Sequence, residues 1–197
     1  MPRTKSVFGL LRYGSRESPL LSNAMTIRTD HFRNVPDWPR DGIQFKDIGP
    51  ILSDPGLLSL AAESLLDESK SLTKDVDFVI APEARGFLFG ATLALGYDAG
   101  FIPARKPGKL PPKTRSVAYE LEYGEDHLHL SHREFEGARV LIHDDLLATG
   151  GTAAALVSLV RELGAEVVGA IFLAEIEPLN GRTALIDVPV ASVVQFT

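Results

Sequence analysis

The sequence predicts an α/β fold in which a mostly parallel central sheet is flanked by helices. Two pairs of segments indicate this fold. A short apolar run at residues 76–81 precedes a helix-like stretch at 87–95, and the apolar run that begins at Arg139 precedes another at 153–163. Such runs are typical of buried strands, and strands that alternate with helices form parallel sheets.

Length and composition favour one globular domain. The chain has 197 residues, of which 45% are hydrophobic and 23% charged, so it can bury a core of ordinary size. It has no apolar run long enough to span a membrane and no apolar segment typical of a secretory signal. The absence of cysteine excludes disulfides and fits a soluble, cytoplasmic protein. The net charge of −6 argues against general nucleic-acid binding, so an anionic ligand needs a local positive patch.

Residues 1–24 form a basic leader that we expect to be poorly ordered. They carry Arg3, Lys5, Arg12 and Arg16 against the single acid Glu17. Two explanations stay open, because such a leader is typical of a transit peptide and the second methionine, at position 25, also fits a misassigned start. Residues 25–197 are the predicted domain.

Local signals place the remaining elements. Residues 36–52 mix Pro, Gly and apolar residues without a sustained period, which predicts a structured loop. Asp54 and Pro55 open an amphipathic helix that runs to about residue 70, since a capping acid and a first-turn proline are typical helix starts. Strands are expected at 101–104, 126–131, 166–175 and 188–196, and a short helix at 179–186.

The most specific signal follows the apolar run that begins at Arg139. It reads Asp144, Asp145, Leu146, Leu147, Ala148, Thr149, Gly150, Gly151 and Thr152. The free N–H groups and dipole of the following helix favour an anion, the glycines allow close approach, and the threonines add hydroxyl donors. The two acids lie where open α/β sheets bind ligands, and they suit a hydroxylated sugar or hydrated Mg²⁺. An ordinary turn with two solvated acids explains the Asp pair alone, but not the whole string.

A basic segment supplies the positive patch that the acidic chain needs. Residues 100–118 contain no acid, and their five basic residues are Arg105, Lys106, Lys109, Lys113 and Arg115. Its prolines and glycine predict a loop, and long loops on a rigid scaffold are commonly lids or ligand clamps. The alternative is an ordinary solvated loop.

Three histidines, His127, His129 and His132, raise the question of a zinc site. Strand alternation puts His127 and His129 on one face and the nearby leucines on the other, and no fourth ligand is evident. We therefore predict surface histidines.

Taken together, these motifs resemble the type I phosphoribosyltransferases, and among them those that act on adenine. Besides the Asp144–Thr152 string, the similar segments lie at residues 36–48, 83–90, 105–111, 119–124 and 179–185, in the same order. The resemblance implies the fold of that family, with a small hood and a flexible lid loop. It implies transfer of a phosphoribosyl group from phosphoribosyl pyrophosphate (PRPP) to adenine in purine salvage, with Mg²⁺, by a homodimer that binds neither nucleic acid nor membrane.

The resemblance also assigns roles. It assigns binding of the ribose and 5′-phosphate to Asp144, Asp145, Ala148, Thr149, Gly150, Gly151 and Thr152. It assigns binding of pyrophosphate to Glu83, Ala84, Arg85, Arg105, Lys106 and Lys109, and binding of adenine to Gln44, Phe45 and Lys46. The catalytic residues that it implies are Glu122, Tyr123 and Arg85. Mg²⁺ is expected to bind together with PRPP, and no protein side chain is assigned as its direct ligand. In the family, the turn before this arginine often contains a non-proline cis peptide.

Three positions depart from the family pattern. Gln44 and His143 stand where aliphatic residues are usual, and Ala81, followed by Pro82, replaces a frequent glycine. Two other functions stay open: a PRPP-binding regulator, which the acidic balance disfavours, and an enzyme for 6-oxopurines. Enzymes that read O6 of the base usually place a lysine over it from the segment after the central motif, and residues 165–176 contain none.

Overall fold

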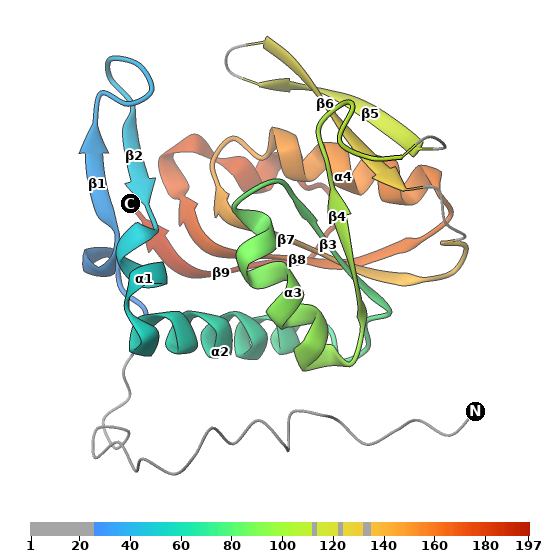
Figure 1. Ribbon diagram of the computed structural model, residues 1–197, viewed down its shortest axis with the longest axis horizontal. Coiled ribbons are helices and arrows are strands. Elements are labelled where there is room, and N and C mark those ends of the chain that lie inside the picture. Colours follow the sequence, from blue (N-terminus) through green and yellow to red (C-terminus); the bar gives the residue numbers. More distant parts are fainter. Residues whose placement is uncertain (1–25, 112–113, 122–123, 132–134) are drawn as a thin grey trace.

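The computed structural model describes residues 26–111, 114–121, 124–131 and 135–197, and Figure 1 shows their arrangement. The α-helices are α1 (Gly49–Ser53), α2 (Pro55–Leu72), α3 (Gly86–Tyr97) and α4 (Gly151–Glu162). The strands are β1 (Arg33–Pro36), β2 (Gln44–Asp47), β3 (Phe78–Pro82), β4 (Gly100–Ala104), β5 (Thr114–Leu121), β6 (Gly124–Ser131), β7 (Arg139–Leu147), β8 (Glu166–Ile176) and β9 (Val190–Phe196). In the described part of the chain, the 3₁₀ helices are η2 (Thr29–His31), η3 (Glu177–Leu179) and η4 (Gly181–Ala184).

A five-stranded sheet in the order β4-β3-β7-β8-β9 forms the centre, and all its neighbouring pairs are parallel. Helices α2 and α3 cover one face and α4 covers the other (Figure 1). Side chains of β7 contribute to the core on both faces of the sheet. Leu141 belongs to the cluster that contains Leu65 and Phe89, and Ile142 belongs to the cluster that contains Leu156. The predicted α/β fold is confirmed.

The strand order creates a switch point between β3 and β7. From β3 the chain passes through α3 to β4 on one side, and from β7 it passes through α4 to β8 on the other. The carboxyl ends of two such strands leave a crevice in which open α/β sheets bind ligands. The residues after β3 and those around the end of β7 therefore meet at one edge.

The prediction of a structured loop at 36–52 is wrong in part. Strands β1 and β2 pair antiparallel over residues 33–47, and α1 follows at once; we call this hairpin the hood. Each strand has four residues and a turn with Pro and Gly joins them, so neither is long enough to show a period. The hood lies beside the carboxyl end of β9 (Figure 1), where Phe32 and Phe196 make an edge-to-face contact with ring centroids 5.2 Å apart.

The basic segment is not a loop throughout. Residues 114–121 form β5, which pairs antiparallel with β6, so pairing with the next strand decides the second half of the segment. In β6, Leu128 and Leu130 are buried while His127 and His129 are half-buried, which agrees with the predicted alternation. The His129 and Arg105 backbones exchange hydrogen bonds of 2.8 and 2.9 Å, which fasten β6 to the end of β4.

The helix expected at 179–186 is instead the pair of short turns η3 and η4. They are separated by Asn180, whose φ of 53° lies in the left-handed region and interrupts any continuous helix. The final strand begins at Val190, two residues later than expected. The leader at 1–24 lies outside the described residues. Within the part of the chain described, no helix is long and apolar enough to cross a membrane.

Candidate active site

Asp144 and Asp145 lie inside β7, close to its carboxyl end, and point to opposite faces of the sheet. Asp145 is 2% exposed and Asp144 is half-buried, and the Asp145 N–H donates a 2.9 Å hydrogen bond to Oδ1 of Asp144. Burial and the neighbouring carboxylate raise the pKa of Asp144 well above its ordinary value. Burial also raises the pKa of Asp145, and the Arg85 guanidinium opposes that rise. A ligand that donates hydrogen bonds or carries positive charge would therefore stabilise the ionised form of the pair.

Arg85 forms an ion pair with one of these carboxylates. It follows β3, and its Nε lies 3.1 Å from Oδ2 of Asp145. The two atoms are not aligned for a hydrogen bond, and both Oδ2 of Asp145 and Nη1 of Arg85 are buried without a hydrogen-bond partner. The guanidinium carbon lies 5.0 Å from the centroid of the Phe45 ring. Buried polar groups are normally satisfied, so the missing hydrogen bonds of these two atoms are consistent with a polar ligand at this edge of the sheet.

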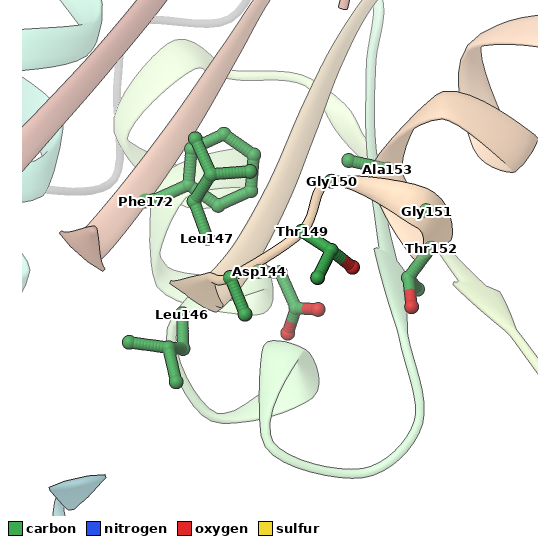
Figure 2. Close-up of a pocket in the computed structure, with 10 residues that line it drawn as sticks. Asp144, Leu146, Leu147, Thr149, Gly150, Gly151, Thr152, Ala153 and Phe172 are labelled. Carbon is green, nitrogen blue, oxygen red and sulfur yellow. The ribbon is translucent and has the colours of Figure 1, made fainter. Parts of the chain in front are cut away.

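The turn from β7 into α4, residues 148–152, has the geometry of an anion-binding loop, and we call it the phosphate loop. Gly150 caps α4 with a φ of 84°, in the region that favours glycine, and Gly151 begins the helix. Together with Asp144 the loop lines a pocket, in which the Asp144 carboxylate and the hydroxyls of Thr149 and Thr152 face a common space (Figure 2). The unpaired N–H groups at the start of α4 favour a phosphate here.

The turn between β3 and α3 brings other predicted residues to the same edge. The peptide bond between Glu83 and Ala84 is cis, as the resemblance suggested. The Glu83 carboxylate accepts hydrogen bonds from the Arg105 side chain and, at 2.8 Å, from the Lys106 N–H. Burial opposes ionisation of Glu83, but these bonds outweigh it and lower its pKa. Glu83 thus orients the end of β4, while Lys109 is exposed farther along the turn.

The hood residues Gln44, Phe45 and Lys46 lie on β2, where successive side chains alternate. Phe45 faces Arg85 and packs against Trp38, with ring centroids 4.4 Å apart. Gln44 and Lys46 both bond the Asn34 amide, at 2.7 and 2.9 Å. They border a second cleft, lined also by Gly42, Ile43, Ile176, Pro178, Leu179, Phe196 and Thr197. The three predicted base-binding residues thus point to two sides of one strand.

His143, which precedes the acidic pair, is fully buried. Its Nδ1–H donates a 3.0 Å hydrogen bond to the Ile171 carbonyl, while Nε2 is buried without a partner. Burial lowers the pKa of this imidazole to about 4, so the ring is a neutral core group. It does not line the pocket formed by Asp144 and the phosphate loop.

Two predicted catalytic residues, Glu122 and Tyr123, lie outside the described residues. In contrast, the sequence motifs did not indicate Glu175, a buried acid bound by Arg182, whose neighbour Gly181 contacts the phosphate loop. An acid at the end of an otherwise apolar strand was the available signal. Among the residues that the structure describes, no group of three or more His, Cys, Asp or Glu side chains could hold a metal ion. Any cation at the Asp pair would need oxygens from its ligand and water.

Comparison with known proteins shows the family to which the chain belongs. A profile of the phosphoribosyl transferase domain matches residues 49–185. The adenine phosphoribosyltransferase of Synechocystis sp. is 47% identical over 166 residues, 83% of this chain and 96% of that protein. The corresponding protein of Thermoanaerobacter sp. is 49% identical over 167 residues, 83% of this chain and 94% of that one.

Solved structures of adenine phosphoribosyltransferases have the same fold as this chain. The crystal structure of adenine phosphoribosyltransferase from Thermoanaerobacter pseudethanolicus has a TM-score of 0.81 and 47% identity, and the match covers 85% of this chain and 96% of that one. The Saccharomyces cerevisiae enzyme, complexed with adenine and an imino-altritol bisphosphate, has a TM-score of 0.76 and 38% identity, with coverage of 83% and 94%. The fold expected from the resemblance is confirmed.

The buried imidazole gives a prediction for acid stability. The His143 pKa falls from 6.5 to about 4 on folding, so between these values the unfolded chain binds a proton that the folded chain cannot. Above pH 6.5 this group does not reduce the free energy of unfolding. As the pH falls toward 4, the group lowers the free energy of unfolding by about 3 kcal/mol. His143→Leu should remove that loss. Urea unfolding of both proteins from about pH 7.5 to pH 4 measures it, and parallel stability curves would contradict the assignment.

Proposed function

Because the chain belongs to the phosphoribosyltransferase family and within it to the adenine phosphoribosyltransferases, we propose that it transfers the phosphoribosyl group of PRPP to adenine, giving AMP and pyrophosphate. One observation carries this proposal. The buried acidic pair on β7 runs directly into the phosphate loop, with Arg85 opposite. This arrangement offers acceptors for ribose hydroxyls, donors for the 5′-phosphate and a guanidinium for the departing pyrophosphate, all at the switch point of the sheet.

The chemistry of the transfer explains why these groups are needed. The bond between ribose and pyrophosphate breaks through a state with oxocarbenium character, in which the sugar carries positive charge and the leaving group negative charge. Asp144 and Asp145 accept hydrogen bonds from the ribose hydroxyls and stabilise the cationic sugar. Arg85 donates from its unpartnered Nη1 to the leaving pyrophosphate, a charge-assisted hydrogen bond. Donors fixed in place before the reaction lower its barrier without reorganisation.

The remaining predicted residues complete the proposed site. Arg105, oriented by Glu83, and the backbone of the Glu83–Ala84 turn lie beside Arg85 and add donors for pyrophosphate, as do Lys106 and Lys109. The resemblance assigns Glu122 and Tyr123 to the lid, with Glu122 as the proton acceptor or orienting group for the base. Phe45, next to Arg85, offers a ring on which adenine can stack.

We also propose that Mg²⁺ accompanies PRPP. Magnesium usually keeps several waters and binds through one or two carboxylates together with substrate phosphates, and the Asp144–Asp145 pair beside the phosphate loop fits that pattern. When bound, the ion neutralises charge on the diphosphate. Asp145 Oδ2, buried without a hydrogen-bond partner, can accept from a hydroxyl or a metal-bound water.

The direct test is an assay with PRPP, Mg²⁺ and adenine, hypoxanthine or guanine, in which the nucleotide product is measured. Adenine presents a donor at its amino group where the other bases present an acceptor, so a pocket built for one leaves a polar group unpaired with the other. We expect adenine to be preferred by more than about a hundredfold in kcat/KM. Gln44→Leu should keep the preference, because the Gln44 side chain bonds Asn34 on the side of β2 opposite to Phe45. Equal turnover of hypoxanthine would overturn the adenine assignment, and no product with any base would favour a PRPP-binding regulator.

A second prediction concerns the acidic pair. Asp144→Asn with Asp145→Asn preserves the size of both side chains but removes their charge, so it should lower kcat/KM by about a hundredfold or more while the fold survives. The matched control is Asp77→Asn, at the amino edge of the same sheet, where Asp77 pairs with Arg139. The control should keep its activity. Activity of the double variant within a few-fold of the unmodified chain would refute the role.

We further propose that the chain forms a homodimer through the outer face of α3. This helix carries apolar residues all round, and Leu88 and Leu95, which share one face, are 46% and 60% exposed. Helix α3 begins directly after Arg85, so a partner on this face lies near the site. Large exposed apolar side chains gathered on one face are typical of an interface.

Light scattering tests the dimer. The unmodified chain should be dimeric at micromolar concentration, and Leu88→Glu with Leu95→Glu should give monomers because charges would face each other across the contact. Ile186→Glu, at a residue that is 72% exposed on another part of the surface, should leave the dimer intact. A monomeric unmodified chain with full activity would be inconsistent with this proposal.

A further inference from the structure

Arg182 does not line the site, yet its guanidinium joins the segment of residues 177–184 to the ends of β8 and β9. Its Nε donates to the Glu175 carboxylate at 2.8 and 2.9 Å, and its Nη2 donates to the same carboxylate at 2.7 Å. Its Nη1 donates to the Val190 carbonyl at 3.0 Å, and Nη2 also reaches the Ser192 hydroxyl at 3.2 Å. One side chain thus makes contacts to two strands, and a planar guanidinium suits such fixed, multiple bonding.

Glu175 is the buried partner of this arginine. Its side chain is 4% exposed, and the Ser192 hydroxyl donates to it at 2.9 Å. The hydrogen bonds from Arg182 outweigh burial and lower the pKa of Glu175, so the carboxylate stays ionised and bound. A buried carboxylate needs such a partner, which means that the place of Arg182 is fixed firmly by the sheet.

The segment that Arg182 holds touches the phosphate loop directly. A Cβ added to Gly150 would lie 2.3 Å from the Gly181 carbonyl oxygen and 2.9 Å from Cβ of Ala184. Conversely, a Cβ added to Gly181 would lie 2.2 Å from the Ala148 carbonyl oxygen. The two backbones are therefore in contact at the point where Gly150 adopts its left-handed conformation and caps α4. A shift of residues 181–184 would remove the support of the loop.

We propose that the Arg182–Glu175 ion pair is a positioning device for the phosphate loop, which it holds in the conformation that binds the 5′-phosphate through the contact between Gly181 and Gly150. The proposal rests on the function proposed above, because that function places a 5′-phosphate in this loop. Arg182 acts through the backbone and does not touch the ligand. The ion pair should affect binding of the 5′-phosphate and not of pyrophosphate, because pyrophosphate binds beside Arg85, in a different turn of the chain.

Titration calorimetry with two separate ligands tests this device. Ribose 5-phosphate reports on the phosphate loop, and pyrophosphate with Mg²⁺ reports on the Arg85 side. Arg182→Met combined with Glu175→Gln removes the ion pair without leaving a buried charge unpaired. We expect ribose 5-phosphate affinity to fall by about tenfold or more, pyrophosphate affinity to stay within about twofold, and KM for PRPP to rise more than kcat falls. Arg182→Lys, which keeps the charge but not the planar fork, should give an intermediate loss.

The matched control is Arg139→Met with Asp77→Asn, which removes another arginine–carboxylate pair of the same sheet, at its amino edge. It should change neither affinity by more than about twofold. Unchanged ribose 5-phosphate affinity in the Arg182 variants, or equal losses for both ligands, would overturn the proposal. If circular dichroism shows that the double variant does not fold, the affinities of Arg182→Lys for the same two ligands test the proposal by the same criteria. Failure of the unmodified chain to bind ribose 5-phosphate would overturn the proposed function itself.

Discussion

Two adjacent carboxylates can be withdrawn from water at the end of a strand only if their charge is compensated. Among the described residues, the ion pair that compensates Asp144 and Asp145 is the one with Arg85, and its alignment leaves a buried atom without a hydrogen bond on each side. The local backbone is adapted to this crowding. A Cβ at Gly86 would lie 2.9 Å from Pro82 and 3.1 Å from the Asp144 carboxylate, so glycine lets α3 begin beside the acids.

The other parts of the site are arranged around this pair. The phosphate loop continues from β7 on the side of α4, and the hood approaches from the opposite side, where Phe45 lies over Arg85. Glu83 holds the end of β4 through Arg105 and the Lys106 backbone. The phosphate loop and the Glu83–Arg85 turn are connections of one parallel sheet, and the hood packs against the end of its strand β9. The sheet therefore fixes their spacing, which is what a reaction that separates charge between sugar and pyrophosphate requires.

Sequence reasoning predicted what is encoded locally. The apolar runs placed the sheet, the glycine-containing turn after Asp145 placed the phosphate loop, and the motif order indicated the family. It failed where an element or a contact is decided by its partner in the folded chain and not by its own residue pattern. The hood strands are too short to show a period and pair only with each other, and residues 114–121 become a strand through pairing with β6. The contact of Arg182 with Glu175, and that of Arg85 with Asp145, join residues whose meeting depends on the folded sheet.

The most direct test of the central claim is a crystal structure of the chain with AMP. The account predicts that the 5′-phosphate accepts hydrogen bonds from the backbone N–H groups and threonine hydroxyls of residues 148–152, that the ribose hydroxyls contact Asp144 and Asp145, and that the base stacks near Phe45. A phosphate bound instead along the basic turn at residues 105–109, with the acidic pair making no contact to the nucleotide, would contradict it.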